Sequence, residues 1–101
     1  MNKYYIRKGD ANPKMEARLT DVDGNSVVNA GDNVELLIEI GETTVSRPVT
    51  IVNKNLGKVE ALMSADMFPE EGIYKAYFRN NSQFLTIPNY TFIEIVVARE
   101  F

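Results

Sequence analysis

The chain of 101 residues contains neither cysteine nor histidine. Without cysteine it has no disulfide, no thiolate nucleophile and no thiolate metal site. Without histidine it lacks the commonest general base near neutral pH and the commonest transition-metal ligand. These absences argue against an enzyme and against a metal or other cofactor, and they predict a fold that is held together by packing alone.

Long apolar runs and clusters of basic residues are also missing. The apolar runs are only a few residues long, which is too short for a transmembrane helix, so we expect no membrane insertion. Residues 1–7 contain no apolar signal core, so we expect no secretion by a signal peptide and a product that stays in the cytosol where it is made, unless it is built into a larger particle. The net charge is −3, and no basic cluster exceeds Arg7-Lys8, which argues against nucleic-acid binding.

The sequence does contain an alternation of apolar and polar residues with period two, interrupted by turn signals. The clearest strand runs from Asn33 to Ile40. Pro48 has no N–H to donate, so we place it on an edge strand or at a bulge. The last strand, 90–98, is apolar on both faces and is expected in the interior or against a partner. Length and spacing predict a single domain, 1–101, with an all-β sandwich of about seven to eight antiparallel strands.

One segment suggests which kind of sandwich this is. An acidic turn containing Pro69 leads through Gly72 into a strand that carries Tyr74. This order is typical of a tyrosine corner, in which the ring fills the edge of the core and the hydroxyl bonds back to the turn backbone. Ala76 occupies the position where antibody domains have cysteine. We therefore predict an immunoglobulin-like β-sandwich in which Gly72 and Tyr74 form a structural corner.

Acidic residues offer two candidate sites, and the spacing argues against both. Asp21–Asn25 suggests a calcium loop, but such loops have Gly at the sixth and Glu at the twelfth position. Here Gly24 stands fourth and Asp32 twelfth, so a hairpin turn is the favoured interpretation. Glu35 and Glu39 lie on one strand face about 13 Å apart, whereas glycosidase carboxyls are about 5–9 Å apart. We assign no catalytic, cofactor-binding or metal-binding residues.

The five Tyr and five Phe residues include candidates for a binding surface. Four of them, Tyr77, Phe84, Tyr90 and Phe92, form our candidate interaction surface, which would bind a sugar or a protein. The alternative is that most aromatic side chains cap the ends of the core, as tyrosines at a sandwich rim commonly do.

The turn motifs also occur in a recognisable order along nearly the whole chain. Gly9-Asp10 stands near the start, Asp21–Gly24 follows the second strand, Gly72–Tyr74 comes late, and Pro88 precedes the last strand. In this order they resemble the N-terminal immunoglobulin-like domain of phage baseplate upper proteins. Ala11 departs from that pattern, because the family usually has Thr after Gly-Asp.

The resemblance implies a virion structural protein of the phage tail or baseplate, made in the bacterial cytoplasm. Such a module positions parts of the host-adsorption apparatus by assembling with other tail and baseplate proteins and with copies of itself as a homo-oligomer. The alternative, from a different functional class, is a carbohydrate-binding module that recognises host cell-surface polysaccharide. Replacing Tyr77 or Phe84 with Ala and measuring binding to host cell wall would separate the two.

Overall fold

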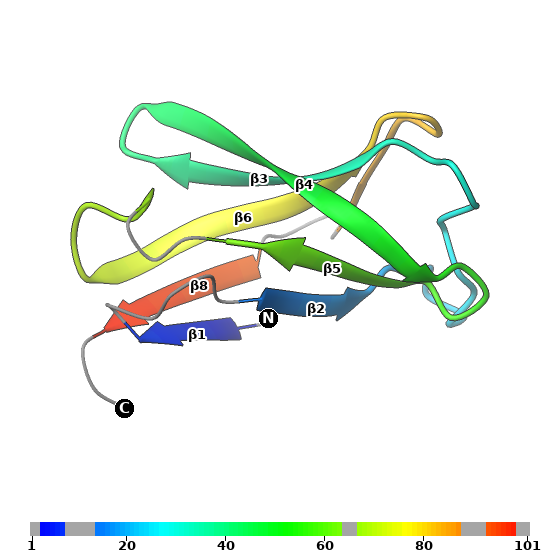
Figure 1. Ribbon diagram of the computed structural model, residues 1–101, viewed down its shortest axis with the longest axis horizontal. Helices are drawn as coiled ribbons and strands as arrows, with labels where there is room; N and C mark the ends of the chain where they lie inside the picture. Colours follow the sequence, from blue (N-terminus) through cyan, green and yellow to red (C-terminus); the bar gives the residue numbers. More distant parts are fainter. Residues whose placement is uncertain (1–2, 8–13, 64–66, 88–92, 99–101) are drawn as a thin grey trace.

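A computed structural model describes residues 3–7, 14–63, 67–87 and 93–98 of the chain (Figure 1). The fold of this part is all-β, as predicted, and about 65% of the residues lie in strands. No helix among these residues is long and apolar enough to cross a membrane. The strands are β1 (Lys3–Arg7), β2 (Lys14–Arg18), β3 (Val34–Ile40), β4 (Thr43–Asn53), β5 (Lys58–Leu62), β6 (Gly72–Asn80), β7 (Leu85–Ile87) and β8 (Ile93–Ala98).

The eight strands form one curled sheet that is nearly closed. Its order is β1–β8–β6–β3–β4–β5–β2, and β7 pairs with β6 next to β8. The long strand β4 joins two layers: its first half, through Pro48, pairs with β3, and its second half, from Val49, pairs with β5. Pro48 therefore lies where β4 has a neighbour on one side only, which suits a residue without an N–H.

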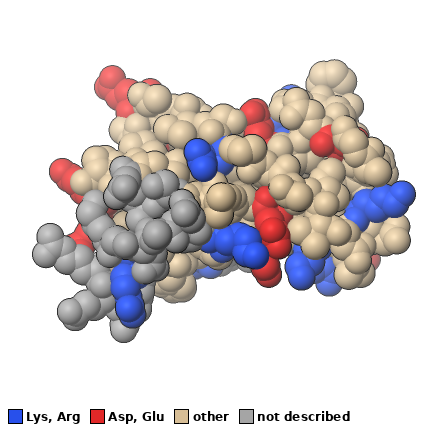
Figure 2. Space-filling model, viewed as in Figure 1, with Lys and Arg blue, Asp and Glu red and all other residues tan. Residues whose placement is uncertain are grey.

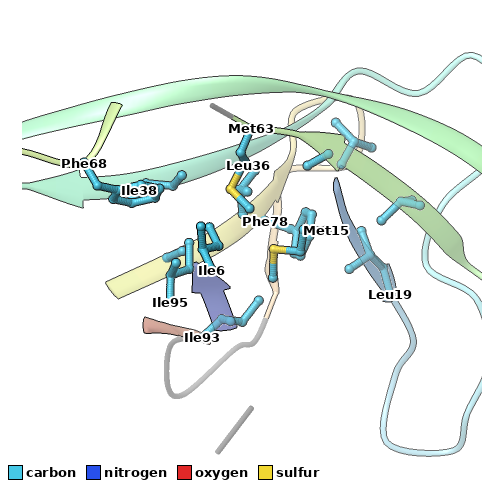
Figure 3. Close-up of a cluster of buried hydrophobic side chains, with 14 of the residues drawn as sticks. Ile6, Met15, Leu19, Leu36, Ile38, Met63, Phe68, Phe78, Ile93 and Ile95 are labelled. Carbon is cyan, nitrogen blue, oxygen red and sulfur yellow. The ribbon is translucent and has the colours of Figure 1, made fainter. Parts of the chain in front are cut away.

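The core lies between the two layers and follows the period of two. Val34, Leu36 and Ile38 of β3 are buried, and the residues between them are only partly buried. The same alternation along β8 buries its odd-numbered residues. Figure 3 shows that side chains from both layers meet in this cluster. Its largest buried members are Ile6, Leu19, Leu36, Ile38, Met63, Phe68, Phe78 and Ile95.

The positions of the first and last strands bear on two predictions. β8 lies between β1 and β6, so the predicted interior position of the last strand is confirmed. The prediction that all strands are antiparallel is wrong for β1, which pairs with β8 in parallel, from Lys3 opposite Glu94 to Arg7 opposite Ala98. A tight hairpin makes its two strands antiparallel, but β1 and β8 come from opposite ends of the chain, so no hairpin fixes their direction.

Candidate functional site

A groove lies between the outer edge of β2 and β7, where the curled sheet stops short of closing. Its volume is about 820 Å³. Buried side chains from both layers, Met15, Phe78 and Ile93, form its floor. Val22 is fully exposed at its rim, and Leu85 on β7 is partly exposed there. We call this site the β2–β7 groove; its lining is mainly apolar.

The backbone of β2 faces β5 on one side and the groove on the other. The Leu19 N–H donates to the carbonyl that precedes β5 at 2.7 Å. The Tyr4 hydroxyl donates to the Lys14 carbonyl from the β1 side. In a strand, the N–H and C=O groups of successive residues point to alternate edges. The N–H and C=O groups of Glu16 and Arg18 therefore point away from β5, as the Lys14 carbonyl does. Within the described ranges they have no strand partner on that side.

The charged side chains of β2 are held towards β5. The Lys14 Nζ lies 3.5 Å from the Glu60 carboxylate and 3.9 Å from that of Glu16. The Arg18 Nε donates to the Leu56 carbonyl at 3.1 Å. Charged side chains often protect an edge strand from pairing, but these contacts tie the Lys14 ammonium and the Arg18 guanidinium to partners on the β5 side. Figure 2 shows charges of both signs interspersed on that face of the molecule.

Tyr4 marks the end of the groove that lies next to β1. It is half-buried, and its hydroxyl links β1 to β2 through the bond to the Lys14 carbonyl. Burial, and to a smaller extent the nearby Glu16 carboxylate, raises the pKa of the Tyr4 hydroxyl. The group therefore stays neutral and acts as a hydrogen-bond donor.

The turn between β6 and β7 presents an aromatic side chain on an unusual backbone. Phe84 has φ of 56°, and its side chain is 80% exposed. The left-handed conformation costs an L-residue about 1–2 kcal/mol and is an outlier for a bulky side chain. Phe84 directly precedes Leu85, the residue of β7 that is exposed at the rim of the groove.

A buried amide holds this turn in place. Asn80 is fully buried at the end of β6. Its Nδ2 donates to the Val27 carbonyl at 3.1 Å and to the Asp32 carboxylate at 2.9 Å. Its Oδ1 accepts the N–H groups of Ser82 and Gln83 at 3.1 and 3.3 Å. The sequence alone did not single out this residue, because its partners Val27 and Asp32 are far away in sequence.

The Asp32 carboxylate is the second centre of this network. Besides the hydrogen bond from the Asn80 amide, it accepts hydrogen bonds from the Asn29 N–H and from the Gln83 Nε2, each at 2.8 Å. These hydrogen bonds lower the pKa of Asp32 below its ordinary value, and the bond from Asn80 has the largest effect on the pKa. The network therefore connects the 27–33 segment to the turn that carries Phe84.

The structure places two of the four candidate surface residues. Phe84 is exposed in its turn, whereas Tyr77 is half-buried on β6, opposite Leu37 on β3. Tyr90 and Phe92 lie outside the described residues. No ring contact between Tyr77 and Phe84 is present in the part of the chain that the structure describes.

The start of β6 has the geometry expected of a tyrosine corner. The Tyr74 hydroxyl donates to the Glu70 carbonyl at 2.6 Å. The Tyr74 ring packs against buried Phe68, with 4.9 Å between ring centroids. Gly72 begins the strand with φ of 155°, a conformation that side chains disfavour.

The acidic segments have local structural roles. The Asp21 Oδ1 accepts the N–H groups of Asp23 and Asn25, each at 2.9 Å, and Thr20 bridges to Ser26. This is the predicted hairpin turn. Over the described ranges, no three His, Cys, Asp or Glu residues gather where they could hold a metal ion.

Comparisons with known proteins identify no family for this chain. No protein-family model matches it. No curated protein matches it significantly in sequence.

Proposed function

We propose that this protein is a non-enzymatic, immunoglobulin-like module of a phage tail or baseplate. It assembles with neighbouring virion proteins and with copies of itself in the host-adsorption apparatus. The observation that carries the assembly role is the β2–β7 groove, in which an edge of β2 that has no strand partner among the described residues lies beside an apolar floor. Unpaired edges and apolar patches are the surfaces through which β-proteins bind other chains.

The phage assignment is supported by the order of the turn motifs along the sequence. The immunoglobulin-like assignment is supported by the hydrogen bond between Tyr74 and Glu70 and by the two strand layers that β4 joins. Ionisable groups at the groove already have structural partners, since Asp21 accepts hydrogen bonds within its own turn and Glu16 lies beside Lys14. These partners favour a binding role over a catalytic one.

A carbohydrate-binding module is the second candidate function. The observation that favours it is the exposure of Phe84, since a sugar ring stacks on an accessible aromatic face. A platform of the kind predicted from the sequence needs two or three such rings. Tyr77 is half-buried, so of the two described candidates only Phe84 offers a ring that is mostly free.

The test is to purify phage particles from the genome that encodes this chain and to identify their proteins by mass spectrometry. We expect the chain in the particle, together with tail or baseplate proteins that co-purify with it when they are expressed together. Absence from the particle would overturn the proposal. Binding of the wild-type protein to host cell-wall polysaccharide, lost in Phe84→Ala, would support the carbohydrate-binding alternative.

A further inference from the structure

We propose that the β2–β7 groove receives an extended strand of a neighbouring protein, which runs antiparallel to β2 and has apolar side chains at alternate positions. The inference rests on the proposed assembly function and specifies how the partner binds. It follows from the edge of β2, from the floor of the groove, and from the way β1 fills the adjacent part of the same gap.

Strand β1 shows, within this molecule, how an extended strand lies beside β2. Ile6 is buried and Tyr4 half-buried, while the alternate residues Lys3, Tyr5 and Arg7 are exposed. Figure 1 shows β1 running opposite to β2, and the Tyr4 hydroxyl reaches the Lys14 carbonyl at the start of β2. Among the described residues, no strand continues this arrangement along the rest of β2.

The backbone chemistry of the edge selects a polypeptide as the occupant. The N–H and C=O groups of Glu16 and Arg18 point into the gap, and an extended backbone supplies matching acceptors and donors at the same spacing. β2, Lys14–Arg18, spans about 13 Å at the usual rise of a strand, which accommodates about five residues.

The floor of the groove selects the side chains of the occupant. Met15, Phe78 and Ile93 are apolar and come from both layers, so side chains that point inward from the docked strand must be apolar. Side chains at the intervening positions point to solvent and are expected to be polar. Leu85 and Val22 extend the apolar contact to the rim.

The probe for this proposal is a synthetic peptide of sequence KTVTVTVK with blocked ends, and its control is a peptide of the same composition with the three valines adjacent. The measurement is amide hydrogen exchange of the labelled protein by NMR. We expect the alternating peptide to slow exchange at Glu16 and Arg18 by about tenfold, because their N–H groups gain acceptors. The control peptide should leave both rates unchanged.

A pair of substitutions at one position tests the backbone role. Arg18→Pro removes the edge N–H and keeps the groups of β2 that face β5, so affinity should fall by about tenfold. Arg18→Ala removes the side chain but keeps the N–H, so it should bind as the wild type does. Equal affinity in both variants would overturn the proposal.

If Arg18→Pro does not fold, a second pair of substitutions tests the groove. Leu85→Asp places a charge at the rim and should abolish peptide binding, whereas Leu62→Asp changes an exposed leucine of β5, outside the groove lining, and should not. Equal binding in both would overturn the proposal.

Two further outcomes would also overturn it. One is that the alternating peptide protects no β2 amide at about 1 mM, a concentration at which even weak specific binding is seen. The other is that the same amides become protected by raising the protein concentration alone, because the occupant would then be a second copy. If the peptide does not bind but the chain is present in purified particles, the proposed function stands. If the chain is absent from the particles, the proposed function is wrong, whatever the peptide experiments show.

Discussion

The two ends of β6 are both fixed by one polar side chain, but over very different distances along the chain. At its start, the Tyr74 hydroxyl bonds to Glu70, four residues away. At its end, the Asn80 amide bonds to Val27 and Asp32, 53 and 48 residues away. The first end holds a local turn, whereas the second holds two distant segments together. The end at which a fully buried amide joins two distant segments should therefore contribute more to stability.

Removal of the Asn80 amide should have the largest effect. Asn80→Ala removes the hydrogen bonds of a fully buried side chain to the Val27 carbonyl and to the N–H groups of Ser82 and Gln83, and each such bond contributes about 0.5–1.5 kcal/mol. We expect a loss of about 3 kcal/mol or more in the free energy of unfolding, measured by urea denaturation. Asn81→Ala is the control, because Asn81 donates its backbone N–H, and not its side chain, to the Asn33 carbonyl, so the substitution should cost less than about 0.5 kcal/mol. Equal losses would contradict the comparison.

The same end of β6 should give acid sensitivity through Asp32. Hydrogen bonds from Asn80, Asn29 and Gln83 lower the pKa of the folded carboxyl below its ordinary value of 3.8. The contribution to stability is therefore complete above that value and is lost as pH falls through the lower folded pKa. We expect Asp32→Asn to remove this part of the acid-induced loss, measured as unfolding free energy between pH 5 and 2. An unchanged pH profile would contradict the role of the carboxylate.

At the start of β6, loss of one hydroxyl should have a smaller effect. Tyr74→Phe keeps the ring against Phe68 but removes the hydrogen bond to Glu70, so we expect a loss of about 1 kcal/mol in urea denaturation. Tyr77→Phe is the control on the same strand, since its hydroxyl has no hydrogen bond among the described residues. Similar losses in both variants would show that the corner bond contributes nothing specific.

The smallest effect is expected in the turn that Asn80 supports, and it has the opposite sign. Phe84→Asn should raise stability by about 0.5 kcal/mol, because asparagine accepts the left-handed backbone more readily than phenylalanine. Phe84→Ala removes the exposed ring but keeps the backbone cost, so its thermal midpoint should not rise. If both variants lower the midpoint equally, the ring stabilises the isolated domain and its exposure needs no partner.

The features that sequence analysis predicted depend on residues close together in the chain. Alternation alone identified the strand around Leu36 and the last strand, and the spacing from Glu70 through Gly72 to Tyr74 suggested the corner. In each case the pattern and its physical cause lie within about ten residues. The period of two also established the all-β class, because it recurs through most of the chain.

The features that it missed depend on residues far apart. Nothing near Asn80 shows that its amide binds Asp32, and nothing near Lys3 shows that the first strand pairs in parallel with the last. The β2–β7 groove combines two edges that are distant in sequence. Phe84 was named as a candidate surface residue, but its left-handed backbone was not predicted, because that conformation is typical of glycine and asparagine.

The parallel pairing of β1 with β8 has a mechanical consequence. Because the two strands run the same way, Lys3 and Ala98 lie at opposite ends of one ladder. Tension between them shears the strands past each other, so the hydrogen bonds of the ladder must break together. Tension between Glu35 and Pro48, which face each other across antiparallel β3 and β4, unzips the bonds one after another. We expect a higher unfolding force for the first pair in single-molecule pulling, so a domain attached through β1 and β8 is held along its most resistant direction.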